Sequence, residues 1–190
     1  MFNRLPQFVE DEGQFTYLDF DLVDEEISAD PNWMRKIRYR VGAVAVEFNA
    51  LEAEIDYSIL DWMNVRAEDD RLWVFLESMT ASKKIDSLFE IYARTFHHCD
   101  VAQATVDAAT NLKRRLNEAN VKRNFYVHAN WHNTINEHVE HRTRRIPTGG
   151  CGRVRRKVTI AEIDNDIETI TQLRHELADF HHETAQAVLG

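Results

Sequence analysis

The sequence predicts an all-α protein, an up-and-down bundle of about five helices with one short β-hairpin before the last helix. Two observations carry this prediction. After residue 31, apolar residues recur at steps of three and four, which is the spacing of one buried helix face. A single cluster of turn-forming residues, 147–152, interrupts that pattern before the last helix. Amphipathic helices joined by short connections bury their apolar faces by packing as a bundle.

The longest predicted helix covers residues 33–64. Pro31 precedes it, and Asp30 or Asn32 is suited to cap its first turn. One continuous apolar stripe along its length predicts that it packs lengthwise into the core. The stripe consists of Val41, Val44, Phe48, Leu51, Ile55 and Ile59.

Four further helices are predicted from the same spacing. They cover residues 72–79, 85–96, 100–128 and 159–180. Thr80 or Ser82 can cap the helix that begins near residue 85. The last helix opens with Thr159-Ile160-Ala161-Glu162, which has the spacing of a capping box.

The predicted hairpin lies at about residues 138–158, around the turn-forming cluster. The N-terminal segment alternates weakly at Leu18, Phe20 and Leu22, so a strand and an irregular arm both stay open there. We therefore divide the chain into an acidic arm, residues 1–30, and a helical domain, residues 31–190.

Charge is distributed unevenly along the chain, whose net charge is -9. One arginine and nine acidic residues lie in residues 1–30, a net charge of -8, so the remaining 160 residues are close to neutral. Residues 142–157 hold seven basic residues and no acidic one. A basic stretch of this kind is compatible with a polyanion partner and equally with a solvated loop.

Several classes of protein are excluded by what the sequence lacks. It has no apolar run long enough to cross a membrane and no secretory signal at residues 1–10, so we expect a cytoplasmic protein. Cys99 and Cys151 form no C-x-x-C pair, and the adjacent His97 and His98 are poorly spaced as metal ligands. Glycine-rich nucleotide loops and the serine-hydrolase motif are also absent. We expect neither a metal nor a cofactor.

The motif that carries chemistry is Arg123-Asn124-Phe125-Tyr126-Val127-His128, near the end of the fourth predicted helix. Cleavage of RNA by its own 2′-hydroxyl needs a base, an acid and positive charge at the phosphorus. Histidine titrates near neutrality, and arginine stays charged and can bind two phosphate oxygens. His128 and Arg123 are therefore suited to these roles. Spacing alone also leaves a structural interpretation open, in which Arg123 is solvated and His128 only ends the helix.

Helical geometry constrains how this motif can act. Asn124 and His128 share a face, whereas Arg123 and His128 diverge by about 140° at 100° per residue. One copy of the helix does not direct both side chains at one phosphate.

At this motif the sequence resembles the HEPN superfamily, helical proteins that often carry R-x(4-6)-H and frequently cleave RNA. The resemblance extends to Phe48-x-x-Leu51-Glu52-x-Glu54-Ile55 in the first helix and to residues 79–85 at the start of the third, and covers residues 33–180. It implies a metal-independent endoribonuclease with Arg123, Asn124 and His128 as catalytic residues.

The resemblance also implies partners. HEPN nucleases typically form homodimers in which two motif helices meet across a cleft, and RNA is their substrate. A toxin or antiviral-defence effector of this kind is restrained by an antitoxin or another regulatory protein. One toxin subgroup has a tyrosine where this chain has Asn130, so the abortive-infection and defence branch fits better. Some members only dimerise or bind nucleotides, and the alternative function is a non-catalytic adaptor.

Other residues are candidates for binding RNA. Lys83 and Lys84 begin a helix and could approach phosphate, or only make the surface soluble. Trp131 could stack on an unpaired base, or pack in the core. The hairpin contributes Arg153, Arg155 and Arg156. We also expect that the acidic arm can fold over this basic surface as an internal mimic of phosphate.

A carboxylate near His128 could hold its tautomer, and Glu47 is one candidate on the first helix, although most helix glutamates are simply exposed.

Overall fold

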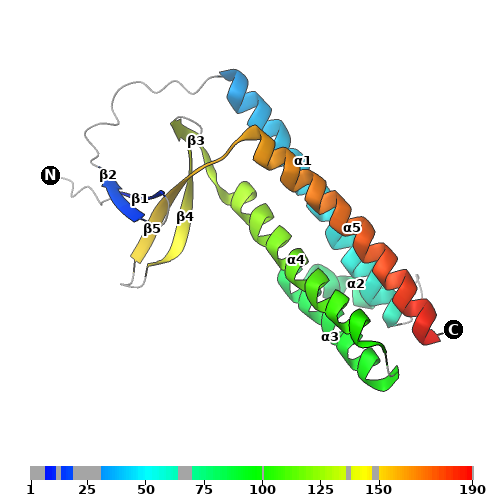
Figure 1. The fold of residues 1–190 in the computed structure, drawn as a ribbon. Coiled ribbons are helices and arrows are strands. Elements are labelled where there is room, and N and C mark those ends of the chain that lie inside the picture. Colours follow the sequence, from blue (N-terminus) through cyan, green and yellow to red (C-terminus); the bar gives the residue numbers. More distant parts are fainter. Residues whose placement is uncertain are drawn as a thin grey trace. The chain divides into compact units, whose positions relative to one another are not determined.

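A computed structural model describes residues 7–11, 14–18, 31–63, 70–99, 101–135, 138–146 and 150–189. The described part contains five α-helices, as predicted (Figure 1). The helices are α1 (Pro31–Trp62), α2 (Asp70–Glu77), α3 (Ala81–Cys99), α4 (Gln103–His128) and α5 (Ile160–Leu189). None of these helices is long and apolar enough to cross a membrane.

Five strands within the described residues form one sheet with the order β2-β1-β5-β4-β3. They are β1 (Gln7–Asp11), β2 (Gln14–Leu18), β3 (Asn130–Ile135), β4 (His138–Ile146) and β5 (Gly150–Lys157). Neighbouring strands are antiparallel except β1 and β5, which are parallel. The predicted lone hairpin is not supported, because β4 and β5 belong to this larger sheet.

The contacts of the chain divide it into two units, which we describe separately. The first comprises residues 1–43 and 124–165, and the second comprises residues 44–123 and 166–190. The predicted boundary at residue 30 stays a prediction, because residues 19–30 lie outside the described part of the chain.

The second unit is a helical bundle whose buried core draws on all five helices, with Leu76 contributed by α2. The stripe predicted for α1 is confirmed, since its members from Val44 to Ile59 are buried. Apolar side chains of α3, α4 and α5 are also buried, and removing this much apolar surface from water is the main stabilising contribution. The core includes Phe48, Leu51, Ile55, Ile85, Leu88, Tyr92, Leu112, Leu116, Ile170, Leu173 and Leu177.

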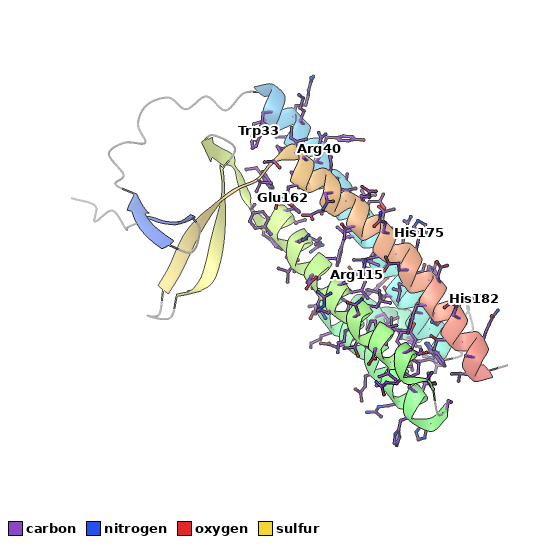
Figure 2. All side chains as sticks on the ribbon, in the orientation of Figure 1. Trp33, Arg40, Arg115, Glu162, His175 and His182 are labelled. Carbon is purple, nitrogen blue, oxygen red and sulfur yellow. The ribbon has the colours of Figure 1, made fainter. Side chains whose placement is uncertain are left out.

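Ion pairs connect the helices of the bundle at its surface. Lys113 of α4 lies 2.9 Å from Asp86 of α3. Arg115, also on α4 and labelled in Figure 2, forms a two-pronged pair with Glu176 of α5, as the two hydrogen bonds between them show. Two parallel N–H···O bonds fix the relative register of α4 and α5 more closely than a single contact would.

The first unit contains the start of α5 and the end of α4. Thr159 caps α5, because its Oγ1 accepts a hydrogen bond from the Glu162 amide at 3.1 Å, as the capping-box spacing predicts. Arg40 of α1 donates two hydrogen bonds to Asp164, at 2.7 and 3.0 Å. Tyr126 of α4 is buried.

Candidate functional site at the end of helix α4

The motif forms the last six residues of α4, which ends at His128. The Ala129 amide donates to the Phe125 carbonyl at 2.9 Å and closes the final turn before the chain enters β3. Helix α4 therefore presents His128 at its end.

Arg123 lies on the buried stripe of α4. Ala119 and Leu116, four and seven residues earlier, and Tyr126, three residues later, lie on the same face of the helix as Arg123. All three are buried. The arginine is itself half-buried. Its Cζ lies 5.6 Å from the centroid of the Phe48 ring on α1. A guanidinium over an aromatic face is held by cation–π attraction, so Phe48 fixes the direction of Arg123.

His128 lies on a different side of the helix. Its side chain is exposed, and Val121, seven residues earlier and therefore on the same face, is 68% exposed. Asn124 is half-buried and lies one turn before His128 on the same side. The exposures thus agree with the divergence of about 140° calculated for an ideal helix. Asn124 and His128 lie together, and Arg123 points elsewhere.

Lys122 adds a second cation beside Arg123, but it is neutralised. Its Nζ lies 2.5 Å from Oδ1 of Asp166, whose side chain is nearly buried. Removing Lys122 would leave the Asp166 carboxylate buried without this partner, because the aspartate side chain is 4% exposed. Lys122 is therefore engaged in an ion pair with Asp166.

Comparisons with protein-family models, with curated proteins and with solved structures found no match to this chain.

The two lysines at the start of α3 differ sharply from each other. Lys83 is exposed, and its amide donates to Thr80 Oγ1 at 3.4 Å. Lys84 is buried, with its Nζ 2.8 Å from Glu52 and 2.7 Å from Asp56. Burial acts to lower the pKa of Lys84, but the hydrogen bonds to the two carboxylates outweigh burial and raise it. The expectation that Lys84 meets phosphate does not fit, because its ammonium is enclosed by carboxylates.

Asp56 completes this buried cluster of charges. Burial raises the pKa of its carboxyl group, and the hydrogen bond from Lys84 opposes that effect. A lysine in the core is stable only when carboxylates compensate its charge. Lys84 therefore connects α3 to α1 and contributes to the fold of the bundle.

Trp131 is placed by packing. Its indole Nε1 donates to the Tyr126 carbonyl at 2.8 Å, and its ring is stacked on the Tyr126 ring at 6.2 Å between centroids. This arrangement ties the start of β3 to the last turn of α4. One face of the indole is covered, so the core-packing alternative describes Trp131 better than base stacking does.

Arg153, Arg155 and Arg156 belong to β5, and the structure gives their positions in the strand register but not their side chains. Glu47 lies in the second unit, where it accepts a hydrogen bond from Thr171 at 3.1 Å. Among the described residues, no group of three His, Cys, Asp or Glu side chains could hold a metal ion.

Two residues that contribute to the site were not predicted from sequence. Phe48 was expected only as core, and Asp166 was not expected at all. The steps Leu112, Leu116, Ala119, Arg123 and Tyr126 already place Arg123 on an apolar stripe, and that signal indicates an arginine held against the core.

Neither of the two cavities described in the second unit is lined by residues of the motif. A groove of about 600 Å³ lies between α1, α2 and α3, with Ile59, Leu76 and Ile91 among its lining residues, and it includes none of the predicted site residues. The end of α4 is instead an exposed surface, which suits a large substrate or a second protein more than a small molecule.

Proposed function

We propose that this protein is a metal-independent endoribonuclease that acts as a homodimer, with Arg123, Asn124 and His128 as catalytic residues. The strongest support is that Arg123 and His128 lie on different faces of α4. Arg123 is held over Phe48, while His128 is exposed at the helix end. Two copies that meet at these ends would pair Arg123 of one with the partner's His128 at a single phosphate.

The reaction needs only these groups and the RNA. His128 takes the proton of the 2′-hydroxyl, and the 2′-oxygen forms a bond to phosphorus. The bond from phosphorus to the 5′-oxygen breaks, and that oxygen leaves as an alcohol by taking a proton from the imidazolium. Arg123 stabilises the negative charge that accumulates on the phosphoryl oxygens. The products are a 2′,3′-cyclic phosphate and a 5′-hydroxyl.

Asn124 lies one turn before His128 and would orient the imidazole or a phosphate oxygen. The exposed Val121 on the same face would be covered by the second copy, since an apolar side chain on a contact surface gains from burial. The basic residues of 142–157 would bind flanking phosphates.

The biological role we propose is a cytoplasmic toxin or antiviral-defence effector that damages RNA once a regulatory protein or antitoxin releases it. An enzyme that cleaves RNA without a metal is active wherever RNA is present. Restraint by another protein is therefore part of the proposal.

A second function is favoured by one observation. The contact between Arg123 and Phe48 is also what a purely structural arginine would make, because its guanidinium covers a core aromatic ring. In that case the protein is a non-catalytic adaptor that binds nucleic acid or partner proteins through its surfaces.

Cleavage of single-stranded RNA in EDTA separates the two functions. The enzyme leaves 2′,3′-cyclic phosphate ends, which mass spectrometry identifies, and His128→Ala and Arg123→Ala abolish cleavage. The adaptor binds RNA without shortening it. Activity that persists in both variants removes the motif from the mechanism.

Matched controls exclude loss of fold and change of charge. His175→Ala removes an exposed histidine of α5 (Figure 2), and Arg94→Ala removes an exposed arginine of α3. Both should keep full activity. Thermal unfolding of each variant shows whether the bundle is intact.

A further inference from the structure

Helix α1 carries two apolar stripes on opposite faces. The first is the buried stripe that includes Val44, Phe48 and Ile55. At 100° per residue, a second stripe falls on the opposite face within a sector of about 80°. We call it the outer stripe, and it consists of Tyr39, Ala43, Val46, Ala50, Ala53 and Tyr57. A surface helix ordinarily presents charged and polar side chains on the face opposite its core stripe, so an apolar row there calls for a partner.

The outer stripe is open to solvent. Its three large side chains are well exposed, Tyr39 at 78%, Val46 at 64% and Tyr57 at 59%. Ala53 is exposed as well, and a Cβ added to Gly42 beside the stripe would meet nothing within 4 Å. Single apolar side chains on a surface are ordinary, but a continuous row of them marks a contact surface.

The spacing of the outer stripe is that of a coiled coil. Its members follow one another at steps of four, three, four, three and four residues, which is the alternation of a and d positions in a heptad repeat. These steps read the same from either end, so the stripe is symmetric about residue 48. A two-fold axis at that level would place two antiparallel copies of the stripe on each other, member against member. The pairs would be Tyr39 with the partner's Tyr57, Ala43 with the partner's Ala53 and Val46 with the partner's Ala50.

Charge along α1 favours the same antiparallel direction. Residues 31–43 hold four basic residues and no acidic one, whereas residues 44–62 hold five acidic residues and no basic one. Two parallel copies would align like charges over the whole length of the contact. Two antiparallel copies bring the basic part of each helix beside the acidic part of the other, and this complementarity selects the partner and its direction.

The charges at the ends of the outer stripe match in this arrangement. Lys36 is exposed, and the two-fold axis brings it within one residue of the level of the partner's Asp61. Both side chains lie on the same side of the stripe, about 40° to 60° from its centre line, and the axis preserves that side. Asp61 lies 2.9 Å from His181 of its own chain, yet its side chain is 67% exposed, so it can also meet a lysine of the partner.

We propose that the outer stripe of α1 binds the outer stripe of a second copy of this chain, antiparallel and about a two-fold axis at the level of residue 48. Burial of the apolar row from both copies drives the association, and the opposed charges set its direction. The small alanines of the stripe allow the two helices to pack at a short distance between their axes.

This contact is separate from the one at the end of α4 in the proposed catalytic dimer. It uses the face of α1 opposite Phe48, whose ring lies under Arg123 of α4. It goes beyond the proposed function and does not depend on it. A chain that carries two different two-fold contacts assembles into more than two copies, so the α1 contact would join catalytic dimers to one another.

The first test measures the mass of the full chain in solution, by analytical ultracentrifugation over a wide range of protein concentration. The variant is Val46→Glu, which would bury a charge at the centre of the contact. The matched control is Val74→Glu on α2, because Val74 is 67% exposed and Val46 is 64% exposed. Val46→Glu should weaken self-association at least about tenfold, and the control should change it less than about twofold. Thermal unfolding of both variants shows whether the bundle is intact.

The second test measures direction and register by disulfide cross-linking, in a background of Cys99→Ser with Cys151→Ser. Chains with Ala43→Cys are mixed with differently tagged chains with Ala53→Cys. The antiparallel contact places residue 43 of one copy beside residue 53 of the other, so mild oxidation should link the two kinds of chain. Neither kind should link to itself, because equal positions of the two copies lie about 15 Å apart along the helices.

A wild-type chain that stays monomeric at every concentration overturns the proposal, and so does equal weakening by Val46→Glu and Val74→Glu. Cross-linking of Ala43→Cys chains to one another would show a parallel or shifted contact and overturn it as well. If the contact at α4 also forms, Val46→Glu leaves dimers, and if it does not, Val46→Glu leaves monomers. RNA cleavage in EDTA is measured separately, so a failure of the proposed nuclease activity is distinguishable from a failure of the α1 contact.

Discussion

The guanidinium of Arg123 lies over the ring of Phe48, with its Cζ 5.6 Å from the ring centroid. Phe48 is fully buried on α1, and Arg123 comes from the end of α4. The contact orients the Arg123 side chain toward α1, and the residues next to Arg123 in the sequence do not specify this orientation. If Arg123 is catalytic, Phe48 is the residue that positions it.

We predict that Phe48→Leu lowers the rate of RNA cleavage more than tenfold, whereas Phe48→Tyr retains the rate because it keeps the ring. The leucine variant should lose about 1–2 kcal/mol of unfolding free energy, since part of the cavity is refilled. Single-turnover cleavage and urea unfolding measure the two effects. A leucine variant that cleaves as fast as the wild type would show that the ring does not position Arg123.

A second prediction compares the adjacent lysines. Lys84→Ala should destabilise the bundle by about 3–5 kcal/mol, because it leaves Asp56 and Glu52 without their cation in a region with little access to water. Lys83→Ala should change the free energy of unfolding by less than about 0.5 kcal/mol, since Lys83 is exposed. Urea denaturation of both variants makes the comparison, and equal losses would contradict the buried ion cluster.

The third prediction concerns alkaline pH. The pKa of Lys84 is raised above its ordinary value of 10.5, because hydrogen bonds to Asp56 and Glu52 outweigh the opposing effect of burial. The folded protein holds this proton more tightly than the unfolded chain. The stability contributed by Lys84 is therefore complete below about pH 10.5 and is lost as the pH rises through the raised pKa.

The wild type should consequently lose more unfolding free energy between pH 9 and pH 11.5 than Lys84→Met does. The methionine variant corrects for tyrosines and other lysines that titrate in the same range. Parallel losses in the two proteins would show that Lys84 titrates alike in the folded and unfolded states.

Local patterns in the sequence predicted the helices well. The stripe from Val44 to Ile59 is buried as its spacing requires, and Thr159 caps α5 where the capping box places it. Both depend on residues within one or two helical turns of each other. Such signals do not depend on how the rest of the chain folds.

Contacts between distant segments were not predicted. Lys84 lies one turn before Leu88 on a buried face, but its partners Glu52 and Asp56 belong to another helix. The parallel pairing of β1 with β5 joins residues 8–9 to residues 154–155, and no local pattern in the sequence indicated it. The helical spacing around Arg123 could have placed it on an apolar face, but it could not have predicted the contact with the Phe48 ring.

The central claim is that one active site takes Arg123 from one copy and His128 from the other. Co-expression of differently tagged Arg123→Ala and His128→Ala chains, followed by two-step purification, isolates mixed dimers. Each mixed dimer holds one complete site and one site that lacks both residues, so it should cleave RNA at about half the wild-type rate. Mixed dimers as inactive as either variant alone, beside an active wild type, would contradict the claim.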